Sequence, residues 1–312
     1  MISGIIAGGM GAGGGGGPAF GTHSYWRLFV TNNNGNASFI ALAELEFLDG
    51  TGALIAATGG SAIASSVVTG GSAADAFDSS TSTSWATTSG VVTDSWIGYQ
   101  FPSPVGVEGV RLGAKSVNPD QTPKDCTLQY SDDGMSWTDV FSFTNRLWVR
   151  EAYTQFPETL GDGYHRAWRV FAINVDGGSG VSMQELELRA TAGGADQTSS
   201  PGSNDGNSSG RAISSFVTGG GNEPWRAFDN TSANWFISSA NGGSANSWIG
   251  YIFPDPVKVE EISITAASTN FNRTPKDMLL QYSDDGVNWE TQKTFPSQTG
   301  WSSNETRVLT AI

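Results

Sequence analysis

The chain has 312 residues, of which 30 are acidic and 16 are Lys or Arg, so its formal net charge is −14. This length predicts about two domains, each able to bury a core of its own without disulfides or metals. The negative charge repels phosphate backbones and argues against a nucleic-acid partner. The single cysteine, Cys126, cannot form a disulfide within the chain and is interpreted as a core residue.

Residues 1–21 (MISGIIAGGMGAGGGGGPAFG) are rich in glycine and contain no Lys or Arg. A secretory signal peptide begins with basic residues, and no later apolar run is long enough to cross a membrane, so we expect neither a signal peptide nor membrane insertion. The glycine run also lacks the GK[ST] ending of a phosphate loop. We predict an assembly arm in which residues 1–18 pack against partner subunits. Its apolar anchors are Ile2, Ile5, Ile6 and Met10.

After the arm, six blocks of sequence occur twice in the same order. They are residues 26–27 and 168–169 (WR), 44–46 and 185–187 (ELE), 76–78 and 227–229 (AFD), 95–99 and 247–251 (SWIGY), 122–125 and 274–277 (TPKD), and 128–134 and 280–286 (LQYSDDG). Repetition in conserved order predicts two copies of one domain, over residues 22–161 and 162–312. The second copy has extra residues at 197–210, whose Ser, Asn, Gly and Pro content predicts a surface loop.

Each copy has the pattern of β-strands. Trp26, Leu28 and Val30 alternate with polar or exposed positions, as expected of a half-buried strand. The Asp133-Gly134 pair predicts a tight hairpin with positive φ angles. No segment has sustained helical periodicity, so we predict an all-β protein of two tandem antiparallel β-sandwiches with jelly-roll character. Six matched tryptophans are interpreted as core or turn supports: Trp85, Trp96, Trp137, Trp235, Trp248 and Trp289.

The blocks AFDSSTSTSW, SWIGYQF, TPKDCTLQYSDDGMSW and YWRLFV…ALAELEF together resemble the discoidin or coagulation-factor type C module, a galactose-binding-like β-sandwich. The resemblance covers about residues 22–312. In that family the aromatic-Arg strand and the acidic strand usually end the domain, whereas here they open each copy. The copies therefore look circularly permuted, as in similar proteins of bacteriophage tails, fibres or capsid decorations. An alternative partition runs one conventional domain from Ala57 to Ala190 and leaves fragments at both ends.

The resemblance also implies a structural Ca²⁺. In the first copy its ligands would be Asp78, Thr83 and Glu44, and a turn rich in hydroxyls with two carboxylates can supply the oxygens that calcium prefers. A solvated turn in which Asp78 caps its own backbone is the alternative. In the second copy Asp229 and Glu185 remain, but the turn is one residue shorter and Ala233 aligns with the threonine.

Residues that the second copy does not share with the first are candidates for ligand binding. Trp225 and Arg226 replace Ala74 and Asp75, and a second group replaces residues 119–121. That second group is Phe271, Asn272 and Arg273. Aromatic faces and planar donors suit a sugar. Packing between domains or subunits is the alternative interpretation of these residues.

These features predict a non-enzymatic, virion-associated protein that docks through its arm and presents two modules to host-surface glycans. Its partners would be other virion subunits and further copies of itself. A purely structural decoration or scaffold protein and a secreted bacterial carbohydrate-binding module are the alternatives. No catalytic residue is predicted, because the aligned carboxylates are explained by strands and turns and no serine has a GxSxG context.

Overall fold

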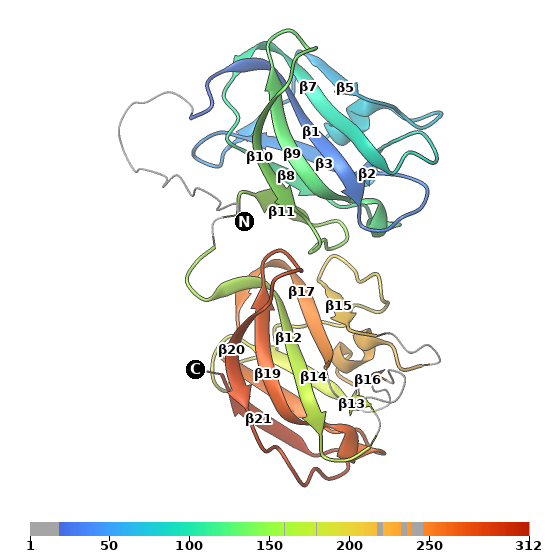
Figure 1. The fold of residues 1–312 in the computed structure, drawn as a ribbon, viewed down its shortest axis with the longest axis vertical. Helices are drawn as coiled ribbons and strands as arrows, with labels where there is room; N and C mark the ends of the chain where they lie inside the picture. The colour runs from blue at the N-terminus through green and yellow to red at the C-terminus, as the bar shows by residue number, and fades with distance from the viewer. Residues whose placement is uncertain are drawn as a thin grey trace.

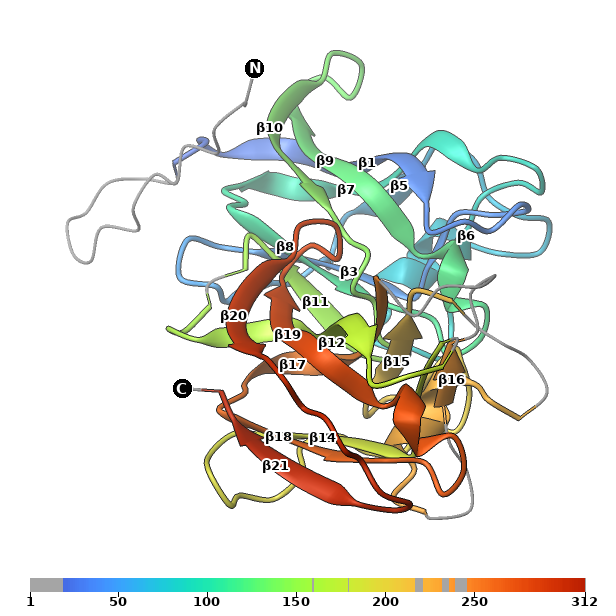
Figure 2. The same cartoon turned by 60° about the horizontal axis from the view of Figure 1, so that its bottom comes forward.

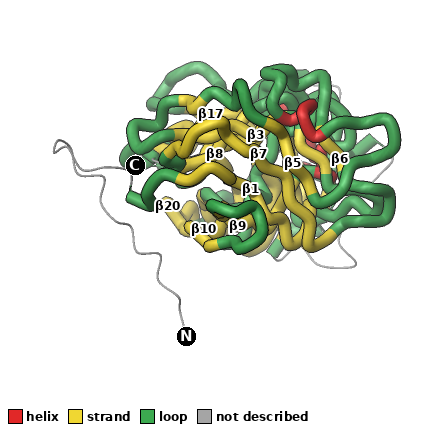
Figure 3. Tube along the Cα trace, turned by 90° about the horizontal axis from the view of Figure 1, so that it is seen from above, coloured by secondary structure: helices red, strands yellow, loops and turns green. Residues whose placement is uncertain are grey.

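The computed structural model describes residues 19–158, 160–178, 180–216, 221–231, 236–238 and 246–311. The predicted arm anchors Ile2, Ile5, Ile6 and Met10 lie outside these residues, and so do Ala233 and Trp235. The described chain forms strands joined by loops and four short 3₁₀ turns (Figures 1 and 3). Its named strand pairs are all antiparallel, which confirms the all-β prediction.

Strands up to residue 156 form one set of hydrogen-bonded sheets, which we call the first unit. One sheet has the order β10-β9-β1-β7-β5, another has the order β11-β8-β3-β4, and β2 pairs with β6. The strands are β1 His23–Asn33, β2 Ala41–Leu42, β3 Glu44–Leu48, β4 Leu54–Ile55, β5 Ser61–Ala64, β6 Trp85–Ala86, β7 Thr93–Val105, β8 Gly109–Gly113, β9 Pro123–Ser131, β10 Thr138–Thr144 and β11 Tyr153–Phe156. The 3₁₀ turns are η1 Ala73–Ala76 and η2 Pro119–Gln121.

Strands from residue 164 onward form a second set, the second unit, with the orders β15-β17-β12-β19-β20, β14-β18-β21 and β13-β16. Figure 2 shows its two main layers, one above the other. The strands are β12 Tyr164–Val175, β13 Val181–Met183, β14 Glu185–Arg189, β15 Arg211–Ser214, β16 Phe236–Ser238, β17 Ser247–Lys258, β18 Glu261–Thr265, β19 Pro275–Ser283, β20 Glu290–Phe295 and β21 Thr306–Thr310. The 3₁₀ turns are η3 Pro224–Phe228 and η4 Phe271–Arg273.

The core of each unit lies between its sheets, as in a β-sandwich. Trp26 and Leu28 of β1 pack in one cluster with Phe47 of β3 and Leu112 of β8, and all four side chains are buried. The equivalent cluster of the second unit contains Trp168 of β12, Leu186 of β14 and Ile264 of β18, all of them buried. Alternate residues of β1 are therefore buried, because successive side chains of a strand point to opposite faces. Cys126 is buried in the first cluster, as predicted.

Strand register repeats between the units. Trp26 faces Tyr99 on β7 and Tyr130 on β9, while Trp168 faces Tyr251 on β17 in the same way. Gly98 of β7 precedes Tyr99, and a Cβ on Gly98 would lie 2.3 Å from the backbone oxygen of Trp26. The SWIGY blocks therefore need glycine because the neighbouring backbone leaves no room for a side chain.

One local prediction was wrong in detail. At the hairpin after β9, Gly134 has a φ of 72° but Asp133 does not share the positive region. Asp133 instead accepts hydrogen bonds from the backbone N–H groups of Met135 and Ser136, and these bonds lower its pKa to about 2. The segment at 197–210 forms a loop with exposed residues, as predicted, although Pro201 and Gly206 within it are buried.

Candidate ligand-binding surfaces

The turn after η1 brings the three predicted metal ligands of the first unit together. The Ser80 backbone N–H donates to Glu44 Oε1 at 2.7 Å and to Asp78 Oδ1 at 2.9 Å. The Thr83 hydroxyl donates to Asp78 Oδ2 at 2.7 Å. Asp78 thus caps its own turn, as the alternative interpretation proposed. The same turn is also hydrogen-bonded to Glu44, the first residue of β3.

The two carboxyl groups of this turn have opposite pKa shifts. Burial raises the pKa of Glu44 to about 7, and a hydrogen bond with Asp78 adds to the effect. Burial works in the same direction on Asp78, but hydrogen bonds from Thr83 and from the protonated Glu44 outweigh it and lower the pKa of Asp78. The pair therefore tends to hold one proton near neutral pH, a proton that a bound cation would displace.

The second unit repeats the arrangement with a different hydroxyl. The Thr231 backbone N–H donates to Glu185 Oε1 and to Asp229 Oδ1, both at 3.0 Å, and its hydroxyl donates to Asp229 Oδ1 at 2.8 Å. Thr231 therefore occupies the place of Ser80, and its hydroxyl bonds the aspartate as that of Thr83 does in the first unit. The alignment had suggested that the second turn lacked this hydroxyl because Ala233 stood in its place.

Burial raises the pKa of Glu185 to about 8, and repulsion from Asp229 contributes further. Glu185 Oε2 is buried without a hydrogen-bond partner among the described residues. An orphaned carboxylate oxygen beside a second carboxylate and a hydroxyl fits a hard cation. Within the described ranges no cluster of three or more Asp, Glu, His or Cys side chains suited to a metal occurs. Each turn would therefore supply two carboxylates, with hydroxyl and carbonyl oxygens as the remaining ligands.

The first group of predicted ligand-binding residues lies on η3. Trp225 is half-buried and packs against the core of the second unit. The Arg226 guanidinium lies 4.5 Å from the centroid of the Trp225 ring, and its Nε donates to Glu223 Oε2 at 2.7 Å. This stack holds both side chains in fixed positions at the surface of the unit.

The second predicted group lies on η4, where Phe271 is 38% exposed and Asn272 is also exposed. Arg273 lies against the loop after β12, since a Cβ at Gly178 would approach its Cγ to 3.0 Å. The two groups are linked through the sheet, because η3 contacts β16, η4 contacts β13, and β13 pairs with β16. All five residues thus lie around one small ladder of the second unit.

A third surface was missed because its tryptophans were interpreted as core or turn supports. Trp85 is fully buried, but Trp96, Trp137, Trp248 and Trp289 are only half-buried. In the first unit the Arg27 guanidinium lies 3.8 Å from the Trp137 ring centroid and 5.0 Å from that of Trp96. Arg169 makes the same contacts with Trp289 at 4.1 Å and Trp248 at 4.9 Å. Trp26 and Trp168 point into the cores, so the following arginines point out, and this alternation was the signal for an outward-facing stack.

The F5/8 type C domain family model matches residues 61–159, which run from β5 through β11 of the first unit. Domains of this family are generally binding modules, and the match suggests carbohydrate or surface binding. Comparison with curated proteins and with solved structures gave no match. Within the described residues no helix is long and apolar enough to cross a membrane.

Proposed function

We propose that the chain is a non-enzymatic binding protein made of two circularly permuted discoidin-like modules, residues 22–161 and 162–312, behind an assembly arm. Strand pairing supports this division. β1, which carries Trp26, pairs with β7 and β9, whereas β12, which carries Trp168, pairs with β17 and β19. Each opening strand therefore completes the sheet of the residues that follow it.

The recognition surface that we propose is the ladder of the second unit with Trp225, Arg226, Phe271, Asn272 and Arg273. This assignment rests on the difference between the two copies at these positions. In the first unit, Asp75 only closes the capping box of η1, and Pro119 and Gln121 are buried. The fold is therefore maintained without the second unit's aromatic and planar side chains, which leaves them free to recognise a saccharide.

Replacing Trp225 with alanine should remove specific binding to a glycan array, with a loss of at least about tenfold, because the aromatic face would be gone. Leu54→Ala is the matched control, since Leu54 is 55% exposed on the first unit. A specific wild-type signal that survives in Trp225→Ala would contradict the assignment of this surface. No specific signal from either protein would favour a structural role instead.

We further propose that the arm docks the protein into a virion, among other subunits and further copies of this chain. Deleting residues 1–18 should then lower the oligomer mass measured by light scattering, while circular dichroism keeps the β-sheet signal of both sandwiches. Light-scattering masses that are equal for the full chain and the deletion would contradict this role. Substituting Ile2, Ile5, Ile6 and Met10 together by serine should reproduce the deletion if those side chains are the anchors.

A purely structural decoration role is the second candidate, and the stack on η3 favours it. Because Trp225 already packs against its own core and carries Arg226 on its ring, it has the fixed geometry of a subunit contact. Solvent exposure of Trp225 in an assembled particle, measured by acrylamide quenching of a variant with this tryptophan as the reporter, separates the two roles. Quenching that is unchanged on assembly supports glycan display, and protection on assembly supports the structural role.

We also propose that Ca²⁺ binds at the two carboxylate turns. Glu44 and Asp78 would hold it in the first unit, with Thr83 nearby, and Glu185 and Asp229 would hold it in the second. A bound cation would cross-link each turn to the strand that begins with the glutamate. Its role would be to fix the loop rather than to carry out chemistry.

A further inference from the structure

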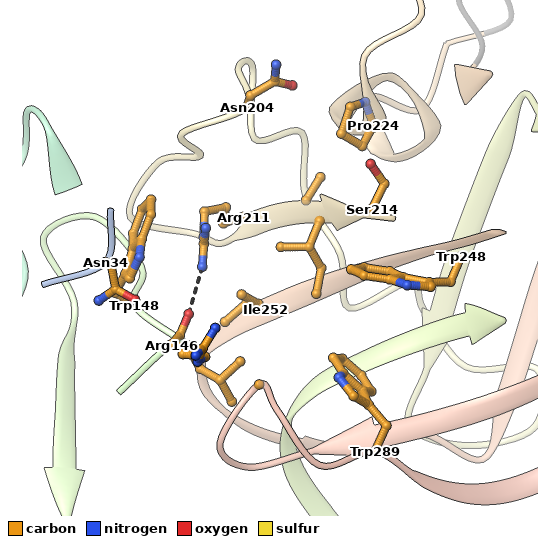
Figure 4. Close-up of a pocket in the computed structure, with 14 residues that line it drawn as sticks. Asn34, Arg146, Trp148, Asn204, Arg211, Ser214, Pro224, Trp248, Ile252 and Trp289 are labelled. Carbon is orange, nitrogen blue, oxygen red and sulfur yellow. Dashed lines mark hydrogen bonds between the residues drawn. The ribbon is translucent and has the colours of Figure 1, made fainter. Parts of the chain in front are cut away.

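A cleft of about 380 Å³ lies where the two units meet (Figure 4). Fourteen described residues line it, and both units contribute to it. Asn34 and residues 146–148 come from the first unit, while β15, β17 and the loops around Asn204 and Gly286 come from the second. Neither unit alone would therefore contain this site.

Specific contacts hold the walls of the cleft together. Leu147 and Val149, which precede β11, form a small buried cluster with Ala167 and Ile252 of the second unit. Arg150 Nη1 donates to the Gly206 backbone oxygen at 3.3 Å, within the loop of extra residues that the second copy carries. This loop is therefore part of the junction, and its extra length has a structural use.

Arg211 and Trp148 form one end of the cleft. The Arg211 guanidinium lies 3.5 Å from the Trp148 ring centroid, and its Nη2 donates to the Arg146 backbone oxygen at 3.0 Å. Trp301 is the equivalent residue of the second unit, because Asn145 and Gln298, three residues before each tryptophan, bond the matched Lys124 and Lys276 backbone oxygens. Trp301 is buried in its own unit's core, where its indole N–H donates to the Pro275 backbone oxygen. In the first unit, Trp148 lies at the junction, against Arg211, and not in that unit's core cluster.

The lining combines aromatic surface with positive charge. Trp248 and Trp289 are half-exposed, with ring centroids 6.1 Å apart and an interplanar angle of 35°. The Arg146 side chain is exposed, and its guanidinium forms no hydrogen bond or ion pair with another described residue. Arg211 Nε is buried without a hydrogen-bond partner, and burial lowers the pKa of Arg211 to about 9.

No Asp or Glu occurs among the described residues that line the cleft, although the chain as a whole has a net charge of −14. Asp205, next to the lining residue Asn204, interacts electrostatically with Arg211 from outside the lining. Two arginines in such a place form a local positive site in an acidic protein. An anionic ligand would satisfy Arg146 and the orphaned Arg211 Nε together, and charge-assisted hydrogen bonds to a carboxylate are among the strongest polar contacts. Asn34 keeps its side-chain oxygen available, because its Nδ2 already donates to the Thr122 and Asn145 backbone oxygens.

We propose that this cleft binds an acidic saccharide, with a sugar ring against Trp248 and Trp289 and a carboxylate against Arg146 and Arg211. The aromatic pair supplies a stacking surface for a pyranose on the part of the rings that the Arg169 guanidinium does not cover, and Arg146 and Arg211 select the charged sugar over a neutral one. The proposal rests on the glycan-binding function proposed above, but it assigns a second site at a different place.

The test is isothermal titration calorimetry of the full chain with sugars matched except for the carboxyl group. The probes are 3′-sialyllactose against lactose, and trigalacturonate against galactotriose. We expect at least one acidic probe to bind about tenfold or more tightly than its neutral partner, and the preference to weaken as NaCl is raised. The Arg146→Ala variant should lose this preference without unfolding, because the side chain is exposed.

The internal repeat offers a matched control for the aromatic wall. Trp289→Ala should weaken binding of the acidic probe by about tenfold, whereas Trp137→Ala removes the equivalent ring of the first unit, away from the cleft, and should leave binding unchanged. Because Trp289 also packs against the junction, Trp289→Phe is included as a variant that keeps the packing and an aromatic face. It should retain most of the affinity.

The absence of any preference for an acidic probe, or a preference that persists in Arg146→Ala, would overturn the proposal. Equal binding of free acetate and the acidic sugars would also overturn it, since it would indicate a simple anion site. Failure of the cleft site can be distinguished from failure of the proposed glycan-binding function. Neutral-glycan binding that is lost in Trp225→Ala, together with no preference of the wild type for an acidic probe, would leave the proposed function standing while removing the cleft site.

Discussion

Replacing Trp168 with alanine should lower the free energy of unfolding of the second unit by about 3–5 kcal/mol. Its side chain is fully buried between the sheets, and its indole N–H donates to the Val257 backbone oxygen at 3.0 Å. The substitution leaves a large cavity and an acceptor without its partner, and both effects destabilise the fold. The loss should be visible as a lower melting temperature in differential scanning calorimetry.

The repeat provides the comparison that makes this result informative. Trp26 is the matched residue of the first unit, also fully buried, and its indole N–H donates to the backbone oxygens of His23 and Val105 at 3.1 Å. Because the two cores share no residue, Trp26→Ala and Trp168→Ala should each shift a different part of the thermogram. If each variant lowered the whole transition equally, the division into domains 22–161 and 162–312 would not describe the folding units. Trp137→Ala, at an outward-facing ring, should cost far less.

In the absence of calcium, the chain should lose stability as the pH rises from about 4.5 to about 8. The folded pKa of Glu44 is raised to about 7 and that of Glu185 to about 8, above the ordinary value of 4.5. The folded state therefore binds more protons than the unfolded state in this window. The stabilising contribution is complete below about pH 4.5 and is lost as the pH passes through the folded pKa values. Because solvent screens these groups, we expect on the order of 1 kcal/mol from each.

Calcium should reverse this trend if the two turns bind it. A cation replaces the proton that each glutamate–aspartate pair holds, so its affinity should rise between pH 6 and pH 8. At a free concentration one hundred times the Kd, binding to the folded state stabilises it by about 2.7 kcal/mol. Melting temperatures measured at pH 8 with CaCl₂ and with EDTA give the effect directly.

Variants at the glutamates separate calcium binding from a general salt effect. Glu44→Gln and Glu185→Gln should each remove part of the pH dependence and part of the response to calcium. Asp94→Asn is the control, because Asp94 is exposed and its positive φ of 50° suits asparagine. A melting temperature that does not respond to millimolar CaCl₂ at pH 8 would leave the turns as hydrogen-bonded structures in which Asp78 and Asp229 cap the backbone.

Residues that occur in both copies show how far local sequence predicts the structure. Trp26 with Leu28, and the SWIGY block around Gly98, predicted the buried strand faces, because alternation along a strand is a local property. The proximity of Glu44 and Asp78 was also predicted, but that prediction came from the family resemblance and not from a local pattern. The hydroxyl of Thr231 was missed, because the alignment of a shortened turn does not indicate which side chain closes it.

The junction could not be predicted in this way. Repetition indicated that Trp248 and Trp289 were core or turn supports, and the extra residues of the second copy predicted a surface loop. Neither interpretation anticipated the junction, because a repeat pattern describes each copy on its own. The contact of Trp148 with Arg211 joins residues that lie 63 positions apart in different copies, and no local pattern contains it.

The amino-acid sequence by itself determined that the chain is all-β, that it contains a duplicated strand pattern, and that alternate residues such as Trp26 and Leu28 are buried in a core. These properties follow from the period of apolar residues and from the repetition of short blocks, and both can be recognised along the chain. Only the tertiary structure decided which tryptophans lie at the surface and which hydroxyl completes each carboxylate turn. It also decided that the two units enclose a cleft. Those features depend on the packing of distant segments, where shape and charge meet only after folding.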